Sequence, residues 1–210
     1  MSNIVQLLNW RYATKKMNAA QQIPAAKLDT ILEAIRLSAS SSGLQPYQVL
    51  VITDPALKQQ IRQVAWDQSQ VTDCSHLLVF AAWDNYTAER INMMFDLVNE
   101  QRGFKNDGWE AYRQKLLAYY PQRPAEQNFE HAARQAYIGL GSALLAAAEQ
   151  QVDATPMEGI DRNTLDRELG LADRGLRSLV MVSLGYRSDS DFNAALPKSR
   201  LPAERVFTHL

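Results

Sequence analysis

The most hydrophobic stretch of the chain lies between Phe129 and Val152. Residues 136–148 carry no charge, and apolar side chains lie on every side of the helical wheel. A helix that is apolar all round is buried on all sides, and this one is shorter than the roughly 20 residues of a membrane span. The pattern predicts a central helix in a protein core, or in a core shared between subunits. Gly139-Leu-Gly141 half-resembles a dinucleotide motif, but it lacks the third glycine and follows no strand.

Amphipathic helices and buried strands alternate along the rest of the chain. Apolar residues at 28, 31, 32 and 35 predict a helix over 24–38. Strands are expected at 47–53, 77–83 and 178–186, the second of them central in its sheet because it is apolar without alternation. A helix capped by Asp54 is expected from Pro55 to about Trp66, and further helices are expected at 2–10, 86–102, 109–120 and 161–170. A turn-rich crossing is expected at 153–160 and an aperiodic tail at 188–210. We therefore expect an α/β or α+β fold, and no repeat or long linker divides residues 1–210 into more than a single domain.

Charge and cysteine content narrow the class of protein. The net charge is −1, from 22 basic and 23 acidic residues, which argues against general binding to nucleic acid or membrane surfaces. A single cysteine, Cys74, excludes an intramolecular disulfide and a multi-cysteine metal site. Polar residues interrupt the start of the chain too early for a signal peptide, so we expect a cytoplasmic protein.

No catalytic constellation stands out among the side chains. His76, His131 and His209 lack the spacing of a metal pair, and Cys74 enters a predicted buried strand, where a small hydrophobic role is commonest. The sequence contains no nucleophile-elbow, P-loop or zinc-protease motif. An enzyme without an evident acid, base or nucleophile leaves the difficult chemistry to a cofactor, so we expect the protein to bind and orient one.

Basic residues near both ends of the chain suggest what that cofactor carries. Arg11 and Lys15 lie near the beginning, and Lys198 and Arg200 lie in a proline-flanked tail. Residues 38–42 contribute four hydroxyl groups to an irregular loop, which is either a plain linker or a set of donors for a phosphate or ribityl chain. Together these groups predict a site for a phosphate dianion.

Four segments, at residues 11–15, 38–46, 156–159 and 196–202, resemble the flavin-binding segments of the FMN-dependent nitroreductase family. The likeness is to its oxygen-insensitive NAD(P)H nitroreductase branch, also described as dihydropteridine reductases, and it covers nearly the whole chain in order. It implies an α+β fold with a central mixed sheet flanked by helices. It also implies an interlocked homodimer with a long central helix and an exchanged C-terminal tail.

The resemblance implies a role for each matching residue. Arg11, Lys198 and Arg200 would hold the FMN phosphate, and Lys15 would lie near the pyrimidine edge. Ser40 and Ser41 would reach the FMN of the partner subunit, Pro156 and Met157 would cover one face of the ring, and the backbone amides of Glu158 and Gly159 would face N5 and O4. No side chain would be essential for catalysis. The full set expected to contact the cofactor is Arg11, Tyr12, Ala13, Lys15, Ser38, Ala39, Ser40, Ser41, Gly43, Gln45, Asp67, Gln70, Pro156, Met157, Glu158, Gly159, Lys198 and Arg200.

The sequence departs from the family pattern beside the flavin ring. Asp67 stands where near relatives carry asparagine, and Gln70 stands where one has a second lysine. A carboxylate would disfavour anionic reduced flavin, so either Asp67 points away or a neighbour such as Gln68 takes its role. The helix that lines the substrate pocket in the family maps to 107–120, where any of Trp109, Tyr112 and Tyr119 is a candidate to contact substrate.

The function implied is an FMN-dependent oxidoreductase. It would pass hydride from NAD(P)H to nitroaromatics, quinones or related acceptors in ping-pong order. Two alternatives remain open from the sequence. One is a flavin-binding or flavin-processing protein of the same fold, and the other is an α/β interaction protein with no cofactor.

Overall fold

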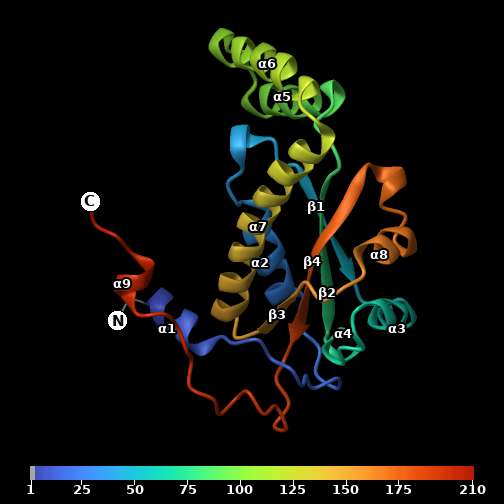
Figure 1. Ribbon diagram of the computed structural model, residues 1–210, viewed down its shortest axis with the longest axis vertical. Coiled ribbons are helices and arrows are strands. Elements are labelled where there is room, and N and C mark those ends of the chain that lie inside the picture. Colours follow the sequence, from blue (N-terminus) through green and yellow to red (C-terminus); the bar gives the residue numbers. More distant parts are fainter. Residues whose placement is uncertain (1–2) are drawn as a thin grey trace.

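The computed structural model describes residues 3–210, so Ser2, the first residue of the predicted N-terminal helix, lies outside the described part. Helices cover both faces of a central sheet, and the N- and C-terminal segments extend along one side of it (Figure 1). Within residues 3–210, no helix is long and apolar enough to cross a membrane.

The sheet consists of β1 (Tyr47–Ile52), β2 (His76–Trp83), β3 (Asp153–Met157) and β4 (Leu176–Gly185) in the order β1-β2-β4-β3. β2 is an inner strand and is almost completely buried, as its uninterrupted apolar sequence predicts. All three strand pairs are antiparallel, so the expected mixed sheet is wrong for this chain. The reason is that each helical connection, between β1 and β2 and between β3 and β4, returns the chain to the end of the sheet from which it left.

Seven of the helices follow the predicted positions to within a few residues, whereas the short helices α4 and α9 are not predicted. Asp54 caps its helix as predicted, because its carboxylate accepts from the backbone N–H of Ala56 at 2.7 Å and of Leu57 at 3.2 Å. The helices are α1 (Asn3–Trp10), α2 (Ala25–Arg36), α3 (Pro55–Val64), α4 (Gln70–Asp73), α5 (Ala88–Arg102), α6 (Asp107–Tyr119), α7 (Ala125–Glu149), α8 (Arg162–Glu168) and α9 (Ala203–Val206).

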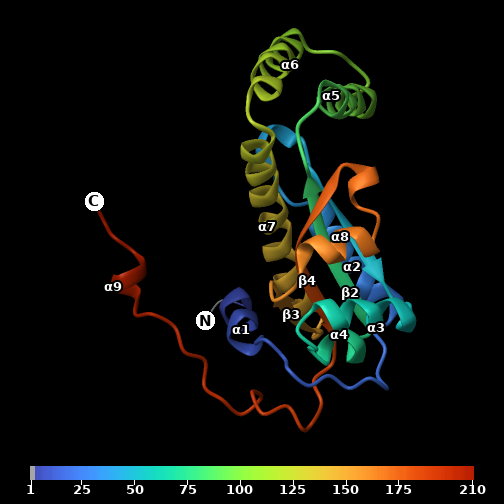
Figure 2. The same ribbon diagram turned by 45° about the vertical axis from the view of Figure 1, so that its right-hand side comes forward.

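Two hydrophobic cores lie on opposite faces of the sheet. Side chains of β2 point alternately to the two faces, with Leu78 and Phe80 on one and Leu77 and Val79 on the other. The first face is covered by α2 and α7, and the second by α3, α4 and α8 (Figure 2). The sheet therefore positions α7 on one of its faces and the loops that precede α4 and α8 on the other face.

α7 is the predicted central helix, but within one chain it is not buried all round. Phe129, Ala136 and Ala143 face the sheet and are buried, whereas Tyr137 and Ile138 are 38% and 47% exposed. The apolar residues of the exposed side are consistent with the second of the two expectations, a core completed by another subunit.

Candidate functional site

Three predicted phosphate-binding cations line a cavity at the edge of the molecule. Arg11 follows α1, while Lys198 and Arg200 come from the C-terminal tail that runs beside it. The cavity measures about 430 Å³ and is also lined by Tyr12, Ala13 and Pro156. The structure thus brings together residues from both ends of the chain and from β3, as the sequence predicts for an anion site.

The cavity is electrostatically unbalanced. Burial lowers the pKa of Arg11, and the neighbouring Arg200 lowers it further. The pKa of Lys198 is lowered by burial and then by Arg11 and Arg200. Asp153 opposes these effects on Arg11, but it is paired with Arg187, a fourth cation in the cavity wall, and no carboxylate of residues 3–210 lines the cavity. A bound anion would therefore be favoured there.

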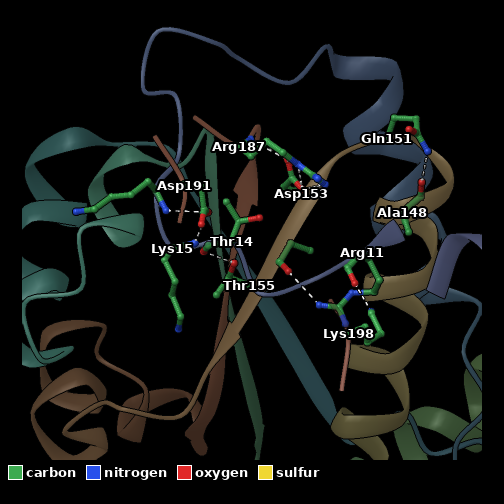
Figure 3. Close-up of polar contacts among 12 residues, drawn as sticks. Arg11, Thr14, Lys15, Ala148, Gln151, Asp153, Thr155, Arg187, Asp191 and Lys198 are labelled. Atoms are coloured by element: carbon green, nitrogen blue, oxygen red, sulfur yellow. Dashed lines mark hydrogen bonds and ion pairs between the residues drawn. The ribbon is translucent and has the colours of Figure 1, made fainter. Parts of the chain in front are cut away.

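Hydrogen bonds place two of these cations. The Arg11 guanidinium donates to the Ala154 carbonyl at 3.4 Å, and its buried Nε has no partner among residues 3–210. The Lys198 ammonium donates to the carbonyls of Leu8, at 2.6 Å, and of Arg11 (Figure 3). Lys198 therefore meets the carbonyls at the C-terminal end of α1, where a cation is favoured. The unpartnered Nε of Arg11 is a donor left over for a ligand.

Two buried acidic residues, which the sequence reasoning missed, build the frame of this cavity. Asp153 forms a bidentate ion pair with Arg187, at 2.6 and 3.0 Å, and Arg187 lies 4.6 Å from the ring centres of both Trp10 and Tyr12 (Figure 3). Burial opposes the charge of Arg187, but its hydrogen bonds to Asp153 raise its pKa overall. The only signal in the sequence is that each residue adjoins a predicted element, Asp153 after the central helix and Arg187 after the last strand.

Asp191 holds the backbone of the segment that carries Lys15. Its carboxylate accepts from the backbone N–H groups of Lys15 at 2.7 Å and Lys16 at 3.1 Å, and of Asn193 at 2.9 Å. The Lys15 side chain points away from Asp191, and its ammonium has no partner within the described chain (Figure 3). Asp191 thus fixes the backbone and leaves the ammonium free.

The predicted flavin-face residues lie at the end of β3, next to this cavity. Pro156 reaches the cavity, whereas the Met157 side chain is buried in the core on the α3–α8 face. Of these two side chains, only that of Pro156 therefore lines the cavity within one chain. Glu158 and Gly159 follow in a tight turn, in which Ile160 N–H donates to the Glu158 carbonyl at 2.8 Å.

Asp67 and its neighbour Gln68 lie differently in the structure. Its side chain is 84% exposed and pairs with Arg62 at 2.6 Å, away from the turn. The Gln68 side chain instead donates to the Gly159 carbonyl at 3.2 Å, and buried Gln70 donates to Gln68 at 3.0 Å. Asp67 thus points away, and Gln68 takes the position beside the turn.

The serine loop lies apart from the cations of its own chain. It packs along the first two thirds of α7, where Ser41 N–H donates to Gln135 at 2.8 Å and the Ser38 hydroxyl donates to Ser142 at 2.7 Å. The cavity lies beyond the other end of α7, beside α1 (Figure 1). Ser40 accepts from Gln45 N–H at 3.0 Å, which shapes a loop containing Ser42, Gly43 and Gln45 at positive φ. Ser38, Ala39, Ser40, Ser41, Gly43 and Gln45 are therefore not brought to the cavity within one chain.

The three aromatic candidates of α6 are also remote from the cavity. α5 and α6 project beyond the far end of the sheet (Figures 1 and 2). Trp109 stacks on Phe95 with ring centres 4.4 Å apart, and the Tyr112 hydroxyl lies 2.6 Å from that of Ser42. Tyr119 is exposed beside Arg123. Tyr112 links α6 to the serine loop, so any role of these two segments in a site belongs to the same end of the molecule.

Comparison with known proteins agrees with this geometry. Residues 8–186 match the sequence model described as the Nitroreductase family. An oxygen-insensitive NAD(P)H nitroreductase of Salmonella typhimurium is 30% identical, covering 99% of this chain and all of its own length. A major NAD(P)H-flavin oxidoreductase of Aliivibrio fischeri is 32% identical, covering 99% of this chain and 98% of its own.

Solved structures show the same fold. A putative nitroreductase of Bacillus subtilis superposes with a TM-score of 0.86 at 19% identity, over 98% of both chains. A putative nitroreductase of Exiguobacterium sibiricum, solved in complex with FMN, superposes with a TM-score of 0.84 at 18% identity, over 100% of this chain and 98% of its own. The arrangement of sheet, α7 and terminal segments is therefore one that other proteins share.

Proposed function

Because the chain belongs to the nitroreductase family, we propose that it is an NAD(P)H-dependent oxidoreductase that holds FMN in the cavity between α1, β3 and the C-terminal tail. The observation that carries this proposal is the cluster of Arg11, Lys198 and Arg200 around one cavity. The acceptors are nitroaromatics, quinones or related compounds, the order of reaction is ping-pong, and the active unit is a homodimer.

The residues present fit FMN better than a dinucleotide flavin. Three cations line one cavity, the Arg11 Nε is a buried donor without a partner among residues 3–210, and the dinucleotide glycine motif is absent from the sequence. Lys15 offers a free ammonium on the same segment as Arg11. A phosphate dianion would offset the mutual repulsion of the cations.

When bound, FMN accepts a hydride from the nicotinamide and passes reducing equivalents to the second substrate. The chain's own residues bind and orient. Arg11, Lys198 and Arg200 would hold the phosphate, and Pro156 bounds one side of the cavity. Lys15 would supply a positive charge that stabilises the reduced cofactor. The amides of the Glu158–Gly159 turn supply donors that need no side-chain chemistry.

The side chains that could act as a nucleophile or base are occupied elsewhere. Cys74 is buried, donates to the Val71 carbonyl, and has its pKa raised by burial to about 11. His76 is 2.8 Å from the Ser75 hydroxyl, and His131 is 2.8 Å from that of Tyr86. We therefore assign no catalytic step to these groups.

The decisive experiment is rapid-mixing reduction of the FMN-loaded protein. Purified protein with FMN should absorb in the near-UV and blue, and NADH or NADPH should bleach it in a first phase that does not require the acceptor. A nitroaromatic or quinone should restore the colour in a second mixing step. If colour returns only when nicotinamide and acceptor are present together, the ping-pong order is wrong.

The same experiment tests the other two functions. A flavin-binding or flavin-processing protein would bind FMN but would not oxidise NAD(P)H, or it would lose the flavin spectrum irreversibly. An interaction protein without a cofactor would not retain FMN through gel filtration. The free donors of Arg11 and Lys15 favour the oxidoreductase and flavin-binding functions over this last one.

A further inference from the structure

The turn at Glu158–Gly159 is joined to two separate parts of the fold. It connects β3 to α8, and its backbone is closed by the bond from Ile160 N–H to the Glu158 carbonyl. Asp161 N–H then donates to the Val64 carbonyl at 2.8 Å, at the end of α3. These bonds fix the path of the chain, but the orientation of the peptide groups depends on the side chains around them.

From one side, α7 reaches the turn through Tyr137. The Tyr137 hydroxyl donates to the Glu158 carboxylate at 2.6 Å. Burial raises the pKa of Tyr137, and the hydrogen bond to Glu158 and the charge of that carboxylate raise it further, so the hydroxyl remains a donor. A phenol on a two-torsion side chain holds its partner with little loss of freedom. The carboxylate is thereby attached to a rigid helix.

From the other side, the loop between α3 and α4 reaches the turn. Gln68 donates to the Gly159 carbonyl, and it is oriented by Gln70, which is buried. The Trp66 ring packs on Gly159 so closely that a Cβ there would lie 2.7 Å from the ring. Trp66 is nevertheless 79% exposed, so the hydrophobic effect of burying its ring does not explain why it packs on Gly159.

The loop is held in an unfavourable backbone conformation. Trp66 and Asp67 have φ of 53° and 51°, the left-handed region that such residues rarely adopt. Asp67 compensates with an ion pair to Arg62 at 2.6 Å, and its N–H donates to the Arg62 carbonyl at 3.2 Å. Strain that the surroundings maintain is typical of functional positions.

We infer that Tyr137 and Gln68 are positioning residues that clamp the Glu158–Gly159 turn from opposite sides and so orient its backbone amides. The inference rests on the proposed function for the ligand those amides face, but the clamp itself is a property of the chain alone. Tyr137 acts through the Glu158 carboxylate, and Gln68 acts through the Gly159 carbonyl. Neither residue needs to touch the substrate.

The first test measures amide hydrogen exchange of peptides covering 156–161, by mass spectrometry, in the protein without added flavin. A hydrogen bond of ordinary net strength changes an equilibrium by about 2- to 10-fold. Tyr137→Phe and Gln68→Ala should each accelerate exchange of these peptides by that factor. Tyr47→Phe is the matched control, because it removes a hydroxyl that donates to the Ile35 carbonyl at 3.2 Å, away from the turn.

The second test is a double-mutant cycle on the FMN-loaded protein. Tyr137→Phe and Glu158→Ala should each lower the limiting rate of flavin reduction by about 2- to 10-fold. Because Tyr137 acts through Glu158, the double variant should be no slower than the slower of the two single variants. KM for the nicotinamide and the Kd for FMN should stay within about twofold if only positioning is lost. Glu158→Gln keeps an acceptor oxygen for Tyr137, so it should retain more of the rate than Glu158→Ala.

The outcomes separate the clamp from the proposed function. Exchange at 156–161 that is unchanged in both Tyr137→Phe and Gln68→Ala would overturn the clamp, whatever the flavin does. Fully additive rate losses for Tyr137→Phe and Glu158→Ala would overturn the route through Glu158. If the wild-type protein binds no FMN while exchange responds as expected, the proposed function fails and the clamp stands.

Discussion

The cations that line the cavity repel one another, and a bound anion would offset this repulsion. Beyond the effect of burial, Arg200 lowers the pKa of Arg11, and both arginines lower the pKa of Lys198. No carboxylate of residues 3–210 lines the cavity with them. Asp153, the nearest acidic partner of Arg11, is engaged by Arg187. The charges are therefore available to a ligand, and the selectivity of the site rests on the charge of that ligand's terminal group.

Replacing Lys198 and Arg200 together with alanine should weaken FMN binding severely. Hydrogen bonds to charged groups contribute about 1.5–3 kcal/mol each, and solvent screening at Arg200, which is exposed, brings the pair to roughly two orders of magnitude in Kd. Flavin fluorescence titration measures this directly. Riboflavin, which lacks the phosphate, is the control ligand, and its affinity should change little. An equal loss for both ligands would contradict a phosphate site.

His131 should make the folded protein sensitive to acid. Burial lowers the pKa of His131, and Arg123 and Arg134 lower it further, so the ring is neutral and can accept from the Tyr86 hydroxyl, whose own pKa is raised by burial. In the unfolded chain histidine titrates near pH ~6.5. Below that pH the unfolded chain takes up a proton that the folded chain resists, so stability is lost as the pH falls towards the lower folded pKa.

The variant that tests this is His131→Asn, which keeps an acceptor and removes the titration. The midpoint of thermal unfolding, followed from pH 8 to about pH 5 in the range where histidine titrates, should fall more steeply for wild type than for His131→Asn. His209→Asn, at an exposed position near the C-terminus, is the control and should follow wild type. If the midpoint of thermal unfolding falls equally with pH in wild type and in His131→Asn, protonation of His131 does not contribute to the loss of stability.

At the scale of elements, periodicity predicts most of the fold, and its failures have physical causes. The inner strand β2 and the capped helix α3 are confirmed because burial and capping are local signals. The residues of β3 are predicted as a turn-rich crossing because Asp153 and Pro156 are unfavourable in strands. Proline is tolerated there because β3 is an edge strand and needs ladder bonds on one side only. The direction of each strand leaves no trace in periodicity, so the expected mixed sheet rests on the family resemblance alone, and the four strands of one chain pair antiparallel instead.

The start of the C-terminal tail is attached to the N-terminal segment by Asp191, which is 5% exposed. Asp191→Ala would leave the backbone N–H groups of Lys15 and Lys16 without this acceptor. An unsatisfied buried donor costs about 1–3 kcal/mol, and the loss is smaller at Lys16, which is exposed. We expect a loss of about 2–3 kcal/mol in the free energy of unfolding, seen as a fall of about 4–10 °C in Tm. Asp189→Ala, at an exposed position two residues before Asp191, should cost little. Equal Tm values for the two variants would contradict the attachment.

At the scale of the whole molecule, the expected site is only half assembled in one chain. Prolines and cations mark the tail in the sequence and predict that its basic residues lie near Arg11, and Arg11, Lys198 and Arg200 do line one cavity. Motif spacing did not reveal Asp153, Arg187 or Asp191, whose pairings join residues more than 30 positions apart. The serine loop and α6 lie at the other end of α7 from the cavity, so a single chain does not bring them to its own cations.

A second copy of the chain would complete the site and cover the exposed apolar surface. Ile4, Val5 and Leu8 of α1 and Ile138 of α7 are exposed, and the tail carries exposed Leu196, Leu201, Val206 and Phe207. The tail runs away from the body of its own chain (Figures 1 and 2). Surface of this kind is a liability on a monomer, and a symmetric pair would bury it in an isologous interface.

We therefore expect light scattering at low micromolar concentration to give about twice the 23.7 kDa of one chain. Ile138→Glu places a charge on the exposed apolar side of α7 and should shift the protein towards monomer. It should also weaken FMN binding, although it lies outside the cavity, because the serine loop of the second chain would no longer reach the cofactor. Gln60→Glu adds the same charge at an exposed position of α3, on the opposite face of the sheet, and should change neither property. An Ile138→Glu monomer that binds FMN as tightly as wild type would show that the site is complete within one chain.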